Sequence, residues 1–370
     1  MINKKMKFRT LMASVLSALM LTATFTACSD DDEWNPLNEG SKIYVAETRA
    51  FVLNEGFYGM NNAGITYFDW AADTTFNYDL FMAQNGKQLG DTGQDIIAED
   101  GFIYVTVYGS NYITKLNSLG VEQATVKLPE ELGEVRYMVE EDGFLYVTCY
   151  GGYVAKVDTK DFEYESAVKV GDNPEHIVEM DDKLYCTNSG WGKDKRVAVI
   201  DTHKFASATF LNVMTNPDNI LEVNDRIFVQ GYGDFYDYPW GELNVKTGEF
   251  KQIGNASSWA TYGDIIYLVN SVTDWSHKKE DGTYPTINYF STYNTATNQL
   301  SNELFLKNMP AELTSASVFG MSVNPYNGHL YIMTSDYVNN GTIYHFDANG
   351  NFVKKFNSTG VGARKIVFFQ

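Results

Sequence analysis

The 370-residue sequence contains only three cysteines and five histidines. Three cysteines cannot form the disulfide framework of a small secreted domain, but 44% hydrophobic residues are enough for a large core. Cys149 and Cys186 each lie inside a hydrophobic, strand-like run, so we predict two buried free thiols. The five histidines occupy different places in the chain, so we expect solvated histidines rather than a three-histidine metal cluster.

Several motifs that carry chemistry are also missing. The chain has no GxSxG nucleophile elbow, no HExxH zinc motif, no P-loop, no glycine-rich dinucleotide fingerprint and no DxDxDG calcium loop. These absences favour a non-catalytic binding protein that needs no cofactor. The enzymatic alternative is a lyase or glycosidase in which Asp95 or Glu175 pairs with Asp234 or Asp237.

Positive charge is scarce, with 28 Lys and Arg against 47 Asp and Glu and a formal net charge of -19. A surface of this sign repels phosphates, so nucleic acid is not expected as a partner. Four of the cations fall within the first nine residues, directly before an apolar run from Leu11 to Ala27. A charged segment followed by an apolar one is typical of an export signal.

The apolar run ends at Phe25-Thr26-Ala27-Cys28, which resembles the cleavage box of bacterial lipoproteins except that Phe25 replaces the usual Leu. We therefore predict a signal peptide over residues 1–27 and lipidation of Cys28, which would leave 343 residues with a formal charge of -23. A short transmembrane anchor is the alternative, although it would need about 20 apolar residues followed by stop-transfer charges.

Four carboxylates follow in Ser29-Asp30-Asp31-Asp32-Glu33. This stretch resembles the signal that sends Bacteroidetes lipoproteins to the outer face of the outer membrane, and we expect a lipid-anchored protein facing the cell exterior. A solvated leash explains the same residues, and both explanations can hold. Residues 28–41 are predicted to form an acidic, disordered tether.

The remaining chain repeats one phrase seven times: a polar turn, an alternating apolar strand, an aromatic or small-residue loop, and a second strand. The equivalent apolar positions in the first of these strands are Phe51, Ile103, Leu145, Leu184, Ile227, Ile266 and Leu330. The mean unit of 49 residues matches a four-stranded propeller blade of about 40–50 residues. Period-two alternation favours sheet, and no long helical stripe competes with it.

A further apolar strand precedes the phrase in every unit except the first. The chain instead ends with the strand-like segment Ala363–Phe369, which has no phrase after it. We predict that this segment completes the first blade and removes the open edges. The fold class is therefore all-β, a seven-bladed propeller over residues 42–370 with four-stranded blades.

In such a blade, the start of the innermost strand and the loop between the second and third strands emerge on the same face. The first-to-second turns are short and polar, whereas the second-to-third loops are long and aromatic, most of all in Gly231–Gly241 with its five rings. The innermost strands are predicted to begin with a ring of residues around the axial opening: Asp95, Tyr137, His176, Asn219, Ser258, Phe319 and Arg364.

Rings carried on a rigid barrel form a platform for a large, flat or semi-rigid ligand. The alternative is that many of these tyrosines only seal the packing between blades. We assign the ligand contacts to Tyr58, Asp95, Tyr108, Asn111, Tyr150, His176, Trp191, Asn219, Tyr232, Phe235, Tyr236, Trp240, Trp275, Tyr337 and Arg364. The longest loop, residues 273–286, is expected to form a second wall.

Taken together, the Cys28-SDDDE start, the Phe51-VLNEGFYGMNNAGITYFD segment and the seven units resemble the YncE-like propeller lipoproteins of Bacteroidetes, and among them the cobalamin-binding BtuG group. The resemblance covers essentially the whole chain after Cys28. It implies that the protein captures cobalamin or a related corrinoid outside the cell and passes it to a TonB-dependent transporter of the BtuB type. A glycan-binding lipoprotein of a polysaccharide uptake system and a purely structural transporter cap are the rival hypotheses.

Overall fold

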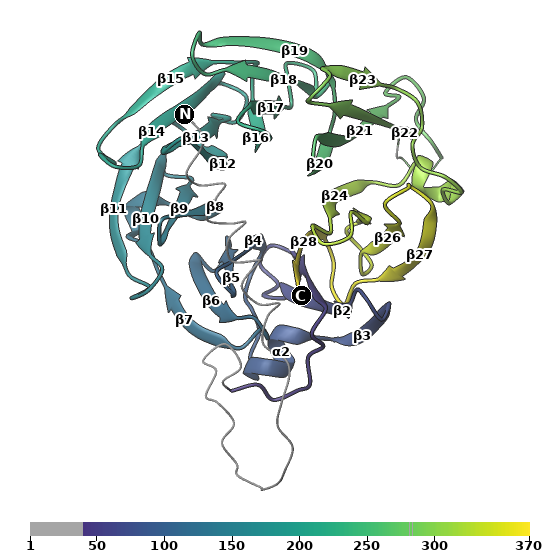
Figure 1. Cartoon of the computed structure of the whole chain (residues 1–370), viewed down its shortest axis with the longest axis horizontal. Coiled ribbons are helices and arrows are strands. Elements are labelled where there is room, and N and C mark those ends of the chain that lie inside the picture. The colour runs from purple at the N-terminus through teal and green to yellow at the C-terminus, as the bar shows by residue number, and fades with distance from the viewer. Residues whose placement is uncertain (1–39, 281, 283) are drawn as a thin grey trace, which may run out of the picture. The chain divides into compact units, whose positions relative to one another are not determined.

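The computed structural model describes residues 40–280, 282 and 284–370, and its strands form seven four-stranded antiparallel sheets set around an axis (Figure 1). The innermost strands, around the axis, are β28 (Ala363–Phe369), β4 (Gly93–Glu99), β8 (Val135–Glu141), β12 (Pro174–Met180), β16 (Pro217–Glu222), β20 (Ser258–Tyr262) and β24 (Val318–Val323). The second strands are β1 (Arg49–Asn54), β5 (Phe102–Val107), β9 (Phe144–Cys149), β13 (Lys183–Asn188), β17 (Ile227–Gly231), β21 (Ile265–Thr273) and β25 (Leu330–Thr334).

The outer half of each blade follows the same order. The third strands are β2 (Gly64–Asp69), β6 (Tyr112–Asn117), β10 (Tyr153–Asp158), β14 (Arg196–Asp201), β18 (Pro239–Asn244), β22 (Thr286–Asn294) and β26 (Thr342–Phe346). The outermost strands are β3 (Thr74–Asp79), β7 (Glu122–Val126), β11 (Tyr164–Lys169), β15 (Ala208–Asn212), β19 (Glu249–Asn255), β23 (Gln299–Ser301) and β27 (Phe352–Asn357). The predicted seven-bladed propeller is confirmed, and blades are numbered 1 to 7 from the one that contains β1.

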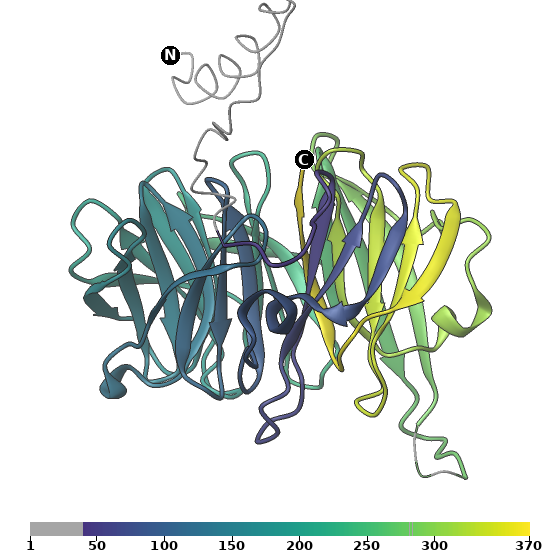
Figure 2. The same cartoon turned by 90° about the horizontal axis from the view of Figure 1, so that it is seen from below.

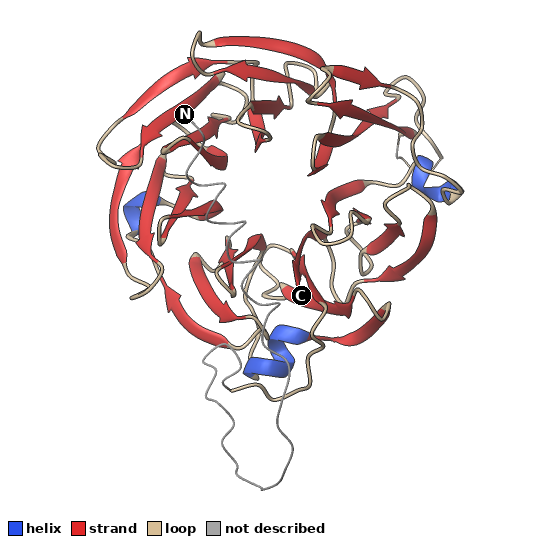
Figure 3. Ribbon diagram, in the orientation of Figure 1, coloured by secondary structure: helices blue, strands red, loops and turns tan. Residues whose placement is uncertain are grey.

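Within the described residues, three short helices lie between blades, in the connections from an outermost to the next innermost strand (Figure 3). They are α2 (Leu80–Asn85), η2 (Glu130–Leu132) and η3 (Ala311–Thr314). The Asp79 side chain caps α2 by accepting from the Met82 N–H, and Gly86 ends the helix in the left-handed conformation with φ 70°.

The ring closes as the sequence predicts, because β28 pairs with β1 in antiparallel register and Phe51 faces Val367. The Trp70 indole N–H also donates to the Phe369 carbonyl at 2.9 Å. Blade 1 therefore joins the two ends of the described chain, and it has four strands like the other six blades.

The seven repeated apolar positions all lie within the first three residues of a second strand and are at most 3% exposed. Four of the turns before these strands use the two-residue geometry in which both residues have positive φ. Asp100 and Gly101 have φ values of 50° and 79°, and Asp142 and Gly143 repeat them at 52° and 82°. Asp and Gly tolerate this conformation, which is why the polar turns mark the blade repeat so regularly.

The innermost strands of blades 1 to 5 and 7 carry an irregularity near their starts. In β4, Gly93 pairs with Val107 but Asp95 already pairs with Thr106, and β8, β12, β16 and β24 show comparable register shifts. A bulge of this kind interrupts strict alternation, so neighbouring residues can face the same side. The bulges therefore determine which side chains face the central axis.

Both cysteines that the structure describes are free and buried, as predicted. Burial raises the pKa of the Cys149 thiol to about 12 and also raises that of Cys186. Within the described residues, no helix combines the length and apolar character needed to cross a membrane. The predicted signal peptide, the Cys28 lipidation site and the tether up to residue 39 lie outside the described part of the chain.

Candidate functional site

The starts of the innermost strands and the loops between second and third strands lie on one face, which we call the mouth face. In Figure 2 this is the lower edge of the propeller, opposite the C-terminal end of β28. Tyr108, Trp191, Tyr236 and Trp275 belong to four different second-to-third loops, so all four lie on the mouth face.

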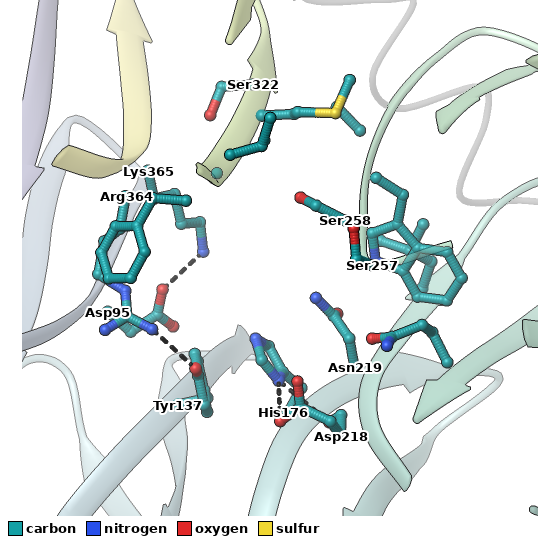
Figure 4. Close-up of a pocket in the computed structure, with 18 of the residues that line it drawn as sticks. Asp95, Tyr137, His176, Asp218, Asn219, Ser257, Ser258, Ser322, Arg364 and Lys365 are labelled. Carbon is teal, nitrogen blue, oxygen red and sulfur yellow. Dashed lines mark hydrogen bonds and ion pairs between the residues drawn. The ribbon is translucent and has the colours of Figure 1, made fainter. Parts of the chain in front are cut away.

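A cavity of about 940 Å³ opens at the centre of this face. All seven residues expected around the axial opening line it: Asp95, Tyr137, His176, Asn219, Ser258, Phe319 and Arg364. The volume lies within the usual range of ligand pockets, about 300–1,000 Å³. Figure 4 shows that polar side chains from opposite blades face one another across the opening.

One side of this cavity, which we call the charged wall, consists of ionisable groups from blades 1 to 5. The members that line the cavity are Glu55, Asp95, Arg136, His176, Asp218, Arg364 and Lys365, and we include Glu175 as the ion-pair partner of Arg136. Lys365 Nζ lies 2.7 Å from Asp95 Oδ1, and Arg364 Nη1 lies 2.8 Å from Glu55 Oε2. Arg364 Nη2 also donates to the Tyr137 hydroxyl at 3.0 Å.

Arg136 is the centre of the charged wall. Its Nη2 lies 2.5 Å from Glu175 Oε2, and its Nη1 donates to Gln94 Oε1 at 2.6 Å. The guanidinium also lies 4.4 Å from the ring centroid of Tyr150 and 5.5 Å from that of Tyr108. Arg136 therefore joins an ion pair to two predicted contact residues and holds their rings in place.

His176 and Asp218 form a second, largely neutral pair. The His176 ring stacks on Tyr137 with centroids 3.4 Å apart, and its Nδ1 lies 3.1 Å from the backbone oxygen of Asp218. Burial, reinforced by the nearby Arg136 charge, lowers the pKa of His176 well below its ordinary value. Burial and the neighbouring Glu175 raise the pKa of the Asp218 carboxyl to about 7.

The other side of the cavity, the hydroxyl wall, comes from blades 6 and 7. It consists of Ser257, Ser258, Ser271, Thr273, Thr286, Ser315 and Ser317. Some of these hydroxyls form hydrogen bonds within the protein; for example, Ser271 Oγ donates to Asn288 Oδ1 at 2.8 Å. Within the described residues, the side-chain hydroxyls of Ser258, Ser315 and Ser317 have no hydrogen-bond partner.

Two residues that line this cavity also carry a buried donor without a partner in the described chain. These donors are Gln94 Nε2 and Trp259 Nε1, whose residues are 2% and 5% exposed. An unsatisfied buried donor is costly unless a ligand or water accepts from it. The groups without a partner are therefore neutral, whereas the charges of this cavity, apart from Asp218, are paired.

Aromatic rings surround the cavity. Tyr58 lies 6.4 Å from Tyr108, which in turn lies 5.7 Å from Tyr150, so blades 1 to 3 share a continuous row. In blade 5, Tyr232 contacts Tyr236 at 5.8 Å, and the Phe235 ring beside them is 85% exposed. These rings are the accessible part of the aromatic loop between Gly231 and Gly241.

The outer aromatic positions are more separate. Trp275 pairs with Tyr284 at 5.0 Å on the long blade 6 loop, and Tyr337 packs edge-on against Phe319 at 5.3 Å. Trp191 is 73% exposed in blade 4 and makes no ring contact within the described residues.

Trp240 does not belong to the mouth face, contrary to our expectation. The loop ends at Tyr238, and Trp240 is the second residue of β18, with no exposed surface. Its ring packs between blades 5 and 6, 5.4 Å from Tyr293 and 6.3 Å from Trp259. This ring seals a blade interface, which was the alternative explanation for the aromatic residues.

Asn111 lies on the mouth face but has an internal role. It adopts a left-handed turn conformation with φ 50°, and its Oδ1 accepts from the Val135 N–H at 3.1 Å. Its side chain ties the blade 2 loop to the start of blade 3.

Sequence reasoning did not assign Arg136, Asp218, Gln94 or Lys365 to the site. Each of them is the sequence neighbour of a residue predicted to surround the axial opening. The bulges near the strand starts let both neighbours line the cavity. The available signal was a polar doublet before the apolar part of the strand, as in Gln94-Asp95 and Asp218-Asn219.

Two of the carboxylates in the enzymatic alternative, Asp95 and Glu175, already form ion pairs with cations of the protein. Asp95 is 2% exposed and paired with Lys365, and Glu175 is paired with Arg136. Within the described residues, Glu141, Glu179 and Asp182 place carboxylate oxygens within 4.8 Å of one another, but they lie at turns on the face opposite the mouth.

No protein-family model matches the chain, and no curated protein matches it. Among solved structures, it is similar to hydrazine synthase of Kuenenia stuttgartiensis, with a TM-score of 0.57 and 16% identity over 71% of this chain and 85% of that one. A functionally unknown protein from Desulfotomaculum acetoxidans gives a TM-score of 0.57 and 13% identity over 87% and 99% of the two chains. A streptogramin B lyase gives 0.52 and 13% over 83% and 87%.

At these identities the similarity establishes the propeller fold alone. Two of the three structures are named as enzymes, so propellers of this kind occur in catalysts. The function of this chain has to be argued from its own site.

Proposed function

We propose that the protein is a non-catalytic surface lipoprotein that captures cobalamin or a related corrinoid at the mouth face and passes it to a TonB-dependent outer-membrane transporter of the BtuB type. The observation that carries this proposal is the chemistry of the central cavity. Apart from Asp218, its charges are paired internally, whereas its groups without a partner in the described chain are hydroxyls, an amide and an indole N–H.

A corrinoid suits these groups. It is large, rigid, nearly neutral as a whole and fringed with amides, so it can exchange hydrogen bonds with neutral donors and acceptors. It would also leave the ion pairs of the charged wall intact, so no buried charge would lose its partner. Rigid exposed rings such as Tyr58 and Phe235 add apolar contact at little entropic cost.

The described start of the chain is compatible with a lipid anchor at Cys28. The Lys42 N–H donates to Gln84 Oε1, and Gly40 lies beside Val121, which follows the turn between β6 and β7 on the face opposite the mouth. A tether reaching the propeller there would leave the mouth face free to meet a ligand.

The test is capture of cyanocobalamin by the purified full chain, kept in detergent because of the proposed anchor. We expect the corrinoid absorbance to travel with the protein through gel filtration. A Phe235→Ala, Tyr236→Ala double variant, which changes only exposed rings, is expected to bind more weakly. Absence of corrinoid absorbance in the wild-type protein peak would overturn the proposal.

The second candidate is a glycan-binding lipoprotein, favoured by the high exposure of two indole rings. Trp191 is 73% and Trp275 is 68% exposed, and sugar rings stack well on such surfaces. Retardation of the protein in polysaccharide gels, without corrinoid capture, would favour this candidate.

A further inference from the structure

A second cavity of about 670 Å³ lies on the mouth face between blades 3 and 4, and we call it the Trp191 cavity. Three cations line it, Lys193, Lys195 and Arg196, together with two carboxylates. In a chain with a formal charge of -19, a site with more cations than carboxylates stands out from its surroundings. Such a site attracts an anion.

The cations of this cavity differ in how they are used. Arg196 forms a two-pronged pair with Asp194, with Nε 2.8 Å from Oδ1 and Nη2 2.6 Å from Oδ2. Lys193 and Lys195 are exposed, and within the described residues neither ammonium group has a partner. Asp172 is the remaining carboxylate of the cavity. The two lysines are therefore the groups available to an incoming anion.

Trp191 adds a flat apolar surface beside the lysines. Its backbone has φ 52°, an uncommon conformation for a bulky residue, between Gly190 at 52° and Gly192 at 82°. Positive φ at three consecutive residues lifts the ring out of the blade and leaves it 73% exposed. Strained, exposed residues of this kind gather at binding sites, where the rest of the fold maintains the strain.

The Trp191 cavity adjoins the central one. Tyr150 lines the former and lies 4.4 Å from the guanidinium of Arg136, which lines the latter. A single large ligand could therefore contact both cavities across this pair. Cobalamin has the required form, because a nucleotide arm with a ring and a negatively charged phosphate diester extends from its corrin ring.

We propose that the Trp191 cavity binds the phosphate diester arm of the corrinoid, with Lys193 and Lys195 pairing the phosphate and Trp191 contacting the flat base. This inference depends on the proposed function, which concerns the corrin ring at the central cavity. It adds a prediction that the central cavity alone does not make: the protein distinguishes corrinoids by the presence of the arm.

The experiment compares cyanocobalamin with dicyanocobinamide, which lacks the phosphate diester and its base. Affinities are measured by calorimetry on the full chain and on a Lys193→Gln, Lys195→Gln double variant. Because the double variant lacks two exposed charge contacts, we expect its cyanocobalamin affinity to be about tenfold lower in low salt. This difference is expected to shrink as salt is added. The affinity for dicyanocobinamide is expected to change by less than about twofold, since no charge contact is lost.

A matched control changes the same charge elsewhere. Lys246 and Lys251 are exposed on the outer part of blade 5, and a Lys246→Gln, Lys251→Gln variant is expected to bind both corrinoids as the wild type does. Equal losses for the two corrinoids, or none for either, would overturn the assignment of the Trp191 cavity. If the wild type binds neither corrinoid, the proposed function itself fails.

Discussion

The charged wall and the hydroxyl wall face each other across one cavity, but they differ in whether their polar groups have partners within the protein. In the charged wall, carboxylates and cations satisfy one another, as in the pairs Asp95–Lys365 and Arg136–Glu175. In the hydroxyl wall, groups such as Ser258 and Ser317 have no partner within the described residues. The comparison suggests that the charges hold the blades in place, whereas neutral groups are available for recognition.

Physical chemistry accounts for this division. A buried charge must be paired, and losing one partner leaves the other in a poorly solvating environment. A hydroxyl at the edge of a cavity can exchange hydrogen bonds with water until a ligand arrives. Variants of the charged wall are therefore expected to lose stability, whereas variants of the hydroxyl wall are expected to lose ligand affinity.

The largest effect is expected from Arg136→Met, which leaves the Glu175 carboxylate buried without its cation. We expect the free energy of unfolding to fall by about 3–5 kcal/mol in urea titrations. Adding Glu175→Gln to Arg136→Met removes the stranded charge and is expected to restore part of the loss. Equal instability of the single and double variants would contradict a structural role for the pair.

The next effect concerns Asp218, whose pKa of about 7 in the folded protein lies above the ordinary value of 3.8 because of burial. The folded state thus favours the protonated acid, so the contribution of Asp218 to stability is most favourable below pH 4 and falls as the pH rises to about 7. Asp218→Asn removes this loss, and at pH 8 we expect the variant to be about 2 kcal/mol more stable than the wild type.

Unfolding curves of the wild type and of Asp218→Asn between pH 4 and 8 test the direction of this pH dependence. The difference between them is expected to grow with pH and level off above 7. A difference that grows toward acid would mean that Asp218 is charged and stabilising in the folded protein.

The hydroxyl wall is expected to respond in the opposite manner. Ser258→Ala with Ser317→Ala is expected to change the free energy of unfolding by less than about 0.5 kcal/mol, because neither hydroxyl has a partner to lose. Cyanocobalamin affinity is expected to fall by about 0.5–1.5 kcal/mol per lost hydrogen bond. Ser207→Ala, an exposed serine before β15, is the control for both measurements.

The smallest effect is expected at the seam between blades 7 and 1, where acid rather than base destabilises. His345 is 3% exposed, and its Nε2 lies 2.8 Å from His329 Nδ1, with Asp73 and Lys354 nearby. Burial and the neighbouring His329 lower the pKa of His345 to about 4. Stability is therefore lost as the pH falls from about 6.5 to 4.

His345→Gln is expected to flatten this acid limb by about 1 kcal/mol, measured as the change in unfolding midpoint between pH 7 and 4.5. If acid affects the wild type and the variant alike, the seam does not carry the acid sensitivity.

The blade repeat could be predicted because its signals are local. A positive-φ turn such as Asp142-Gly143, followed by an alternating strand with Leu145 buried, has the same appearance in sequence and in space. Ring closure followed from the last strand, Ala363–Phe369, having no phrase after it. These features depend on neighbours in the chain or on one long-range pairing.

The cavity lining was only half predictable, for a geometric reason. Strict alternation allows one residue per strand start to face the axis, which identified Tyr137 and Asn219, but the bulges add Arg136 and Asp218. Trp240 was misplaced because loop and strand meet within one aromatic run, and only the register shows that β18 has begun. A repeated polar doublet is the sequence signal that would have improved the prediction.

The most direct test of the account is a calorimetric titration of the full chain with cyanocobalamin, repeated with the Ser258→Ala, Ser317→Ala variant. The account predicts a one-to-one complex of nanomolar or tighter affinity in the wild type and weaker binding by an equally stable variant. A wild type that gives no binding heat, or a variant that binds as tightly as the wild type, would contradict it.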